Sequence, residues 1–443
     1  METEQTKPST VINIAREQQL IRLLMAYLIT GLLFMVLPGT FLGVWNLFAI
    51  SNAQSATSVP AAWIQAHGHA QLFGWIGSFI LGIGFYSIPN LRRVSAWSFW
   101  EGWLTWILWT AGVTLRWLTD VYLWQWKILL PLSAVFEVLA VVLFLAQSIQ
   151  GHRMQNKLKN GLEPWALLVV SGTVGLVITM LVNAFESFRL AVASVSPAFP
   201  PEFDGRFLIL SIWAFPVLIA WGFTARWMPV FLGLKPLKSK LILAALAINV
   251  LGIIAALAKP LLASSSLLLV GAICMVCALR MFERTEKPAK IQGVHKTFPL
   301  FIRIAYAWLL VASLFAVWAA IEPTAAGVAG AGRHAITVGF LMTMVFSVAP
   351  RMLPAFLGRK KLFSERLMFL ALLLTNIGCL VRVSSEALAY QHYASWAWSL
   401  LPISATLELV GVVVFTTNMV GTFFQPPLLA PMANKAAQEG YVK

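Results

Sequence analysis

The chain has 443 residues, of which 59% are hydrophobic and only 11% are charged, and its mean hydropathy is +0.79. This composition excludes a water-soluble globular protein, because soluble domains carry about 25% charged residues. The net charge of +15 does not indicate a nucleic-acid partner here, since the basic residues fall in alternate loops between apolar runs. We therefore expect a membrane protein whose main partner is the lipid bilayer.

Apolar runs recur along the whole chain, and about twelve of them reach the roughly 20 residues that a membrane-crossing helix needs. In chain order the runs start near Ile21, His67, Trp97, Ile128, Pro164, Gly205, Leu241, Leu261, Phe298, Arg333, Leu367 and Trp396. The sequence thus predicts an all-α polytopic protein with about 12 transmembrane helices, forming a single transmembrane domain over residues 1–443.

The loops alternate between basic and poorly basic. Lys and Arg gather at Arg92/Arg93, Arg153/Lys157/Lys159, Lys235/Lys238/Lys240, residues 280–296 and Arg359/Lys360/Lys361/Arg366. The intervening loops, at residues 51–65, 193–205 and 321–332, carry few or no basic residues. Because basic loops stay in the cytoplasm, both short terminal tails are predicted to be cytoplasmic.

Internal similarity divides the chain into three units, at about residues 18–160, 161–297 and 298–425. Residues 205–239 align with residues 332–364 and share the ending R-x-M/L-P-x-F-L-G. The first unit joins through the segment HAQLFGW at His69, which matches HAITVGF at His334. Four helices return the chain to the same side of the membrane, so the sequence predicts three parallel four-helix repeats.

Ionisable residues recur at matched positions inside the apolar runs of the first and third units. The two sets are His69, Arg116 and Glu137, and His334, Arg382 and Glu408. The middle unit lacks them, with Phe207 or Ile209 in place of the histidine and Ala256 in place of the arginine. An ionisable group is costly in the membrane and is a functional candidate by default, so the repetition predicts one shared site.

Imidazoles and guanidinium groups in such a set suit a haem. A histidine from each of two helices can ligate the iron, and we take His67, His69 and His334 as candidate metal ligands. Arg116, Arg382 and Arg333 offer rigid forks for carboxylates such as haem propionates. The alternative is structural: histidines satisfied by neighbouring groups, and arginines that reach the membrane surface.

Glu137 and Glu408 are predicted near the middle of the membrane, each six residues after a proline. Buried carboxylates of this kind are candidates for a proton relay or for cation binding. A protonated carboxylic acid that only bonds two helices together is an equal alternative.

The motifs resemble those of the NnrS family of membrane proteins. The segments that resemble the family motifs are His67 to Trp75, the Tyr306-Ala-Trp308 element, residues 333–339 with Arg351, and Arg226 with Pro229. The resemblance implies a twelve-helix protein of the bacterial inner membrane that binds haem and copper and acts in defence against nitric oxide.

The chain departs from that family pattern at Ala70, Arg303 and Phe356, and these departures bear against copper. The architecture is also similar to subunit I of haem-copper oxidases and nitric oxide reductases. However, the sixth and seventh predicted helices contain no histidine, and the tenth has His334 alone. The residues therefore support a single haem, with two histidine ligands or one, rather than an oxygen-reducing centre.

The sequence thus predicts a haem protein linked to nitric oxide response or nitrosative stress, which senses, scavenges or turns over nitric oxide. Whether it is an enzyme stays open. Two rivals remain: a proton-coupled small-solute transporter that uses Glu137 and Glu408, and an accessory factor of a respiratory complex. The chain has no covalent haem motif of the C-x-x-C-H type and no soluble domain, so an electron donor would be external and is unknown.

Overall fold

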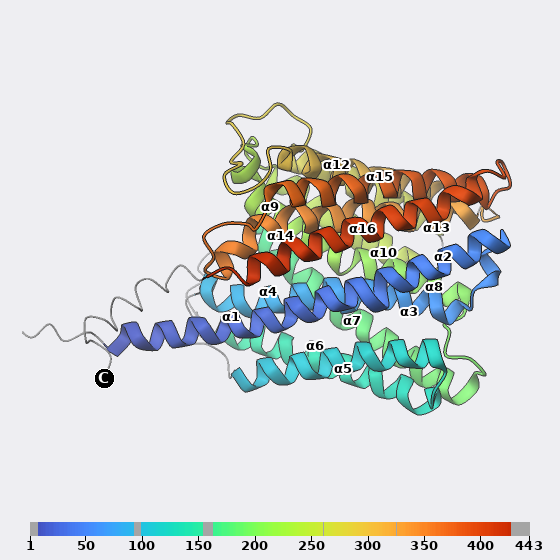
Figure 1. Cartoon of the computed structure of the whole chain (residues 1–443), viewed down its shortest axis with the longest axis horizontal. Coiled ribbons are helices and arrows are strands. Elements are labelled where there is room, and N and C mark those ends of the chain that lie inside the picture. Colours follow the sequence, from blue (N-terminus) through green and yellow to red (C-terminus); the bar gives the residue numbers. More distant parts are fainter. Residues whose placement is uncertain (1–7, 93–98, 154–162, 260, 325, 427–443) are drawn as a thin grey trace, which may run out of the picture.

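The computed structural model describes residues 8–92, 99–153, 163–259, 261–324 and 326–426. Within these ranges every regular element is a helix, and the helices run side by side along the long axis of the molecule (Figure 1). The predicted all-α class is therefore confirmed for the described part of the chain.

Most elements are α-helices, whereas η1, η3 and η4 are π-helical segments and η2 is a short 3-10 turn. In chain order they are α1 (Pro8–Phe34), η1 (Met35–Phe41), α2 (Leu42–Ala53), η2 (Ala56–Ser58), α3 (Ala61–His69), η3 (Ala70–Gly77), α4 (Ser78–Arg92), α5 (Phe99–Tyr122), α6 (Trp126–Arg153), α7 (Pro164–Ala193), α8 (Pro201–Trp213), α9 (Pro216–Leu232), α10 (Ser239–Leu257), α11 (Leu261–Leu279), α12 (Phe298–Ile321), α13 (Ala326–His334), η4 (Ala335–Met342), α14 (Thr343–Phe356), α15 (Glu365–Ala389) and α16 (Ala397–Phe423).

Eleven continuous helical stretches in the described ranges are long and apolar enough to cross a membrane, which makes this a multi-pass membrane protein. The remaining predicted crossing corresponds to α5, which has 24 residues. Tryptophans, threonines and Arg116 make α5 less apolar than the others, and it is not among the eleven. The number twelve therefore stays a prediction.

Several helices begin before the apolar run from which they were predicted. Helix α3 begins at Ala61 rather than near His67, and α13 begins at Ala326 rather than near Arg333. The first crossing extends over Arg16–Ala53, so the expected loop at residues 51–65 is shorter than predicted. In these outer turns polar or glycine residues, such as Gln65 in α3 and Gly327, Gly330 and Gly332 in α13, interrupt the apolar run without ending the helix.

The two matched segments that begin at His69 and at His334 lie beside an unusual backbone. His69 is the last residue of α3 and is followed by η3, and His334 is the last residue of α13 and is followed by η4. Both π-helical segments have eight residues and are almost entirely buried. Such segments occur often at functional sites, because they change the direction in which side chains point.

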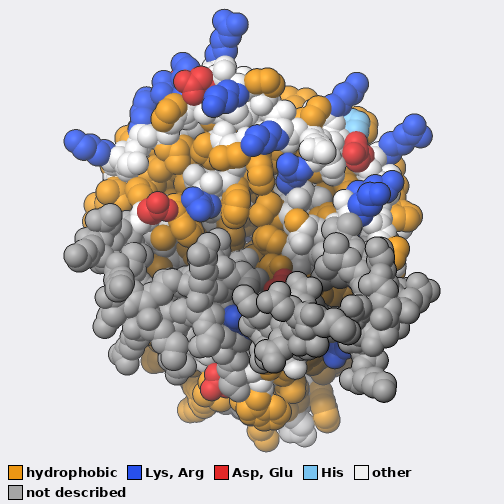
Figure 2. Space-filling model, turned by 90° about the vertical axis from the view of Figure 1, so that its left-hand side faces the viewer, with side chains coloured by type: hydrophobic (Ala, Val, Ile, Leu, Met, Phe, Trp, Pro, Cys, Tyr) orange, Lys and Arg blue, Asp and Glu red, His pale blue; other side chains and the backbone are white. Residues whose placement is uncertain are grey.

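The start of α1 and the end of α16 lie at the same end of the bundle (Figure 1). Lys and Arg side chains gather over this end (Figure 2). Helices α3 and α13 lie toward the opposite end. Some predicted features lie outside the described residues: the helix start at Trp97, the basic residues Arg93, Lys157 and Lys159, and both terminal tails.

The crossing at residues 201–232 is broken in its middle, between α8 and α9. Phe215 has φ −117° and ψ −85°, and Pro216, which has no amide hydrogen, begins α9. Asn249 compensates in part by donating its side-chain N–H to the Trp213 carbonyl at 3.3 Å. Helix α7 packs against the break at Gly175, where an added Cβ would lie 1.9 Å from the Ala214 carbonyl oxygen.

We expect Gly175→Ala to lower the stability of the protein by about 1–3 kcal/mol, because the added methyl group has to displace backbone at the break. Gly205→Ala in α8 is the matched control, since an added Cβ there meets nothing within 4 Å. The thermal midpoint of the detergent-purified variants measures the difference. Equal midpoints would show that α7 does not pack against the break as described.

Candidate functional site

His69 is bonded to Glu137, which comes from the middle of the neighbouring helix α6. His69 Nε2 lies 2.7 Å from Glu137 Oε1, and the two side chains are 7% and 0% exposed. Helix α5 comes close to α6 at Gly112, where an added Cβ would lie 2.7 Å from Glu137 Cγ. The missing side chain of Gly112 thus leaves the room that the glutamate needs.

Helix α7 adds a third group to this couple. Asn183 is buried and its Nδ2 donates to Glu137 Oε2 at 3.0 Å. Both carboxylate oxygens of Glu137 are therefore hydrogen-bonded, one to an imidazole and one to an amide. A buried carboxylate is tolerated only when its oxygens are satisfied in this way.

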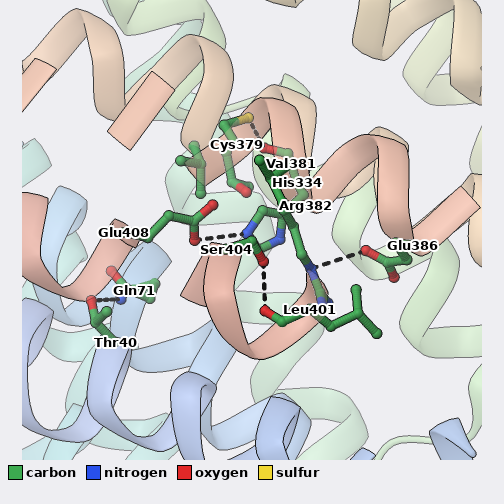
Figure 3. Close-up of polar contacts among 12 residues, drawn as sticks. Thr40, Gln71, His334, Cys379, Val381, Arg382, Glu386, Leu401, Ser404 and Glu408 are labelled. Carbon is green, nitrogen blue, oxygen red and sulfur yellow. Dashed lines mark hydrogen bonds and ion pairs between the residues drawn. The ribbon is translucent and has the colours of Figure 1, made fainter. Parts of the chain in front are cut away.

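The third unit builds a similar couple. His334 Nε2 lies 3.1 Å from Glu408 Oε2, and the two side chains are 22% and 11% exposed (Figure 3). Gly378 on α15 stands opposite Glu408, and an added Cβ there would lie 2.7 Å from Glu408 Cγ. A histidine, a glutamate and a glycine therefore meet in the same way at α3, α6 and α5 and at α13, α16 and α15.

Each arginine of the repeated set forms an ion pair with a carboxylate one helical turn later. Arg116 Nε lies 2.8 Å from Asp120 Oδ2, and Arg382 Nε lies 3.2 Å from Glu386 Oε2. Both pairs are largely buried. Nη1 of both arginines is buried without a hydrogen-bond partner in the described part of the chain, and so is Nε of Arg382, whose contact with Glu386 is an ion pair only. Each guanidinium thus retains an N–H group for a further acceptor.

Sequence reasoning missed Asp120 and Glu386. Both stand four residues after an arginine inside a predicted helix, which is the spacing of an intrahelical ion pair, so the signal was present. Asn183 was also missed, and its sequence context carries no comparable signal.

Both sets face one cavity of about 360 Å³. It lies between α3/η3 on one side and α13/η4 on the other, and α2, α8, α15 and α16 contribute to its walls. The ionisable residues that line it are His67, His69, His334, Arg116, Arg333, Arg382, Asp204, Glu386, Glu408 and Tyr390. Glu137 and Asp120 are not in this lining. They bond to His69 and Arg116, respectively.

His67 also lines the cavity but is held differently from His69. Its Nδ1 lies 2.9 Å from the Gly39 carbonyl oxygen of η1, and its ring packs on Gly43. It is close enough to His334 and Arg382 for their charges to act on it. His67 and His69 therefore point in different directions, as residues two positions apart on a helix do.

The outer wall of the cavity contains residues that the sequence analysis had placed in a loop. Gln65 and Phe199 exchange two hydrogen bonds: Gln65 Nε2 donates to the Phe199 carbonyl at 2.9 Å, and the Phe199 amide donates to Gln65 Oε1 at 2.8 Å. The Phe199 ring lies 4.4 Å from the Arg116 guanidinium carbon. Asp204 belongs to the first turn of α8 and lines the cavity nearby.

Tyr390 lies just beyond the end of α15 and lines the cavity beside Arg382. Burial, with a smaller contribution from Glu386, raises the pKa of Tyr390 to about 12. Its hydroxyl group is therefore protonated at neutral pH and can donate a hydrogen bond.

The three predicted metal-ligand histidines do not form a metal-binding cluster. Among the described residues no group of three or more His, Cys, Asp or Glu side chains is arranged to hold a metal ion. His67 is directed to the η1 backbone, and His69 and His334 are each engaged with a glutamate. The donors that remain are two imidazoles, which suits a haem better than a bare metal ion.

Comparison with known proteins gives limited information. Residues 205–422 match a family described as a domain of unknown function (DUF8744). No curated protein matches the chain. The matched region contains His334, Arg382 and Glu408, and it starts after His69, Arg116 and Glu137.

We expect Asp120→Ala to destabilise the protein by about 3–5 kcal/mol, because it leaves the charge of the buried Arg116 without its partner. Replacing both members, as in Arg116→Met with Asp120→Leu, should restore most of the loss. Glu283→Ala is the control, since Glu283, which pairs with Arg280 and Lys235, is 37% exposed and its pairs should matter far less. The thermal midpoints of the purified variants measure these losses of stability. Equal losses for Asp120→Ala and Glu283→Ala would contradict the prediction.

Proposed function

We propose that this chain is a haem-binding protein of the bacterial inner membrane that takes part in the response to nitric oxide. The observation that carries the proposal is the pair of imidazoles on α3 and α13, which face one cavity and are each bonded to a glutamate from another helix. Metal-ligating histidines commonly use one ring nitrogen for a carboxylate and the other for the metal.

The donor set fits a haem. An ionised glutamate accepts the Nε2–H of its histidine, which leaves the lone pair of a neutral imidazole on Nδ1. Neither of these Nδ1 atoms takes part in a hydrogen bond in the described ranges. The unpartnered Nη1 atoms of Arg116 and Arg382 are suited to the two propionates, and Arg333 lies at the same cavity.

The residues around the cavity would have different roles. Glu137 and Glu408 orient the imidazoles of His69 and His334, and Asp120 and Glu386 hold the two arginines in place. When bound, a haem supplies an iron that takes up small diatomic molecules such as nitric oxide. Sensing, scavenging and turnover all start from such binding, and turnover would need an external electron donor.

We further propose that the three units are parallel repeats and that both termini are cytoplasmic. The matched π-helical segments after His69 and His334 support the repeats. So do the matched contacts of Gly112 and Gly378 with the two glutamates. The basic residues at the end of the bundle where α1 begins support the orientation.

Protein purified in detergent from cells with an ample haem supply should show a stoichiometric Soret band that shifts when nitric oxide is added. His69→Ala combined with His334→Ala should abolish the band, because both ligands are lost. His392→Ala is the control, since that histidine is exposed beyond the end of α15. A wild-type protein without haem, or a double variant with an unchanged spectrum, would refute the proposal.

The same couples support a second candidate, a proton-coupled transporter of small solutes. The supporting observation is that two histidines that line one cavity each bond through Nε2 to a carboxylate, which is an arrangement that can exchange protons. Glu137→Gln and Glu408→Gln should then abolish proton-driven solute uptake by vesicles that contain haem-free protein. Uptake that is absent, or that survives both substitutions, would exclude this candidate.

A further inference from the structure

The two histidine–glutamate couples are not held equally. The couple of His69 and Glu137 is shorter, at 2.7 Å, and its side chains are 7% and 0% exposed. The couple of His334 and Glu408 measures 3.1 Å, and its side chains are 22% and 11% exposed. The couple on α13/α16 is therefore both longer and more accessible.

The glutamates also differ in their remaining bonds. Glu137 Oε2 accepts a hydrogen bond from Asn183, so both of its oxygens are satisfied. Glu408 Oε1 is buried and has no hydrogen-bond partner among the described residues. Displacing His69 would take a hydrogen bond from a fully buried glutamate whose two oxygens are both satisfied, whereas displacing His334 would disturb a glutamate that already has one unsatisfied oxygen. The first displacement is the more costly.

Packing confines His69 further. The ring of Phe73, which follows one turn later in η3, lies with its centroid 4.8 Å from the His69 ring centroid. His334, in contrast, lines the cavity together with the polar side chains of Arg382 and Gln71, both labelled in Figure 3. Gln71 Oε1 is buried without a hydrogen-bond partner in the part of the chain that the structure describes.

We propose that His69 would hold the haem permanently and that His334 would give way, so that a small neutral molecule would bind on the α13 side of the cavity. This inference rests on the proposed haem site. The exchange would break the bond from the His334 nitrogen and form one to the incoming molecule, with no electron transferred. The His334 side chain is 22% exposed, so its ring has room to rotate away.

The test compares two matched single variants, His69→Ala and His334→Ala, in the full-length protein. His334→Ala should retain haem at nearly the wild-type stoichiometry, with the absorption and electron paramagnetic resonance spectra of a high-spin, five-coordinate iron. It should also bind carbon monoxide, used as the neutral diatomic probe, at least tenfold faster than wild type. His69→Ala should lose most of its haem. Added imidazole should return His334→Ala to a low-spin spectrum.

Two glutamate variants provide a second measurement that does not remove a ligand. Glu408→Gln should loosen His334 and raise the high-spin fraction and the carbon monoxide association rate several-fold. Glu137→Gln, the matched change at the tighter couple, should lower haem retention and leave the association rate of the remaining haem close to wild type.

The outcomes separate this inference from the proposed function. If wild type binds no haem, the proposed function itself fails. If wild type binds haem and the two histidine variants lose it equally, or if His334→Ala loses haem while His69→Ala keeps it, the haem site stands and the unequal roles are refuted. Equal effects of Glu408→Gln and Glu137→Gln on the association rate would refute them as well.

Discussion

The structure depends on one constraint, which is that charged side chains inside a membrane must be paired with one another. Four pairs satisfy it around the cavity: two between a histidine and a glutamate, and two between an arginine and a carboxylate one turn away. Each histidine–glutamate pair joins helices that are far apart in the sequence, so these pairs fix how α3 meets α6 and how α13 meets α16. Since a lone ionised group would be strongly destabilising, losing one member endangers the fold as well as the site.

The cavity exists because the surrounding helices are irregular where they approach it. The π-helical segments η3 and η4 follow the two histidines directly, and the crossing formed by α8 and α9 is broken at Phe215. Regular helices packed at ordinary distances would fill this space with side chains. Close packing occurs at Gly112 and Gly378, where the missing side chain leaves room for the glutamates of α6 and α16, and also at Gly43 and Gly330 in the cavity lining.

Much of the fold could be read from the sequence, since helices in a membrane must be long and apolar. The membrane class and most of the crossings followed from composition and hydropathy, but the helix ends at Ala61 and Ala326 did not, because polar or glycine residues there interrupt the apolar run without ending the helix. The histidines and arginines stood out because ionisable groups are rare in such runs. The pairing of His69 with Glu137 could not be derived from spacing, since 68 positions separate them and their contact depends on how α3 packs beside α6. The π-helical backbone and the role of Asn183 likewise arise from tertiary packing.

The site has two halves, one around His69 and one around His334. Their main contacts are alike, so the differences between them are informative. Asn183 completes the hydrogen bonds of Glu137, while Glu408 Oε1 has no equivalent partner in the described ranges. Asp120 in one half corresponds to the longer Glu386 in the other, and the ion pair with arginine is 2.8 Å in the first and 3.2 Å in the second. Both differences act in the same direction: the half built on α3 is held more rigidly than the half built on α13. If the cavity binds a haem as proposed, the first half is the one suited to hold it and the second the one suited to admit a further ligand, because the same imidazole cannot be both fixed and displaceable.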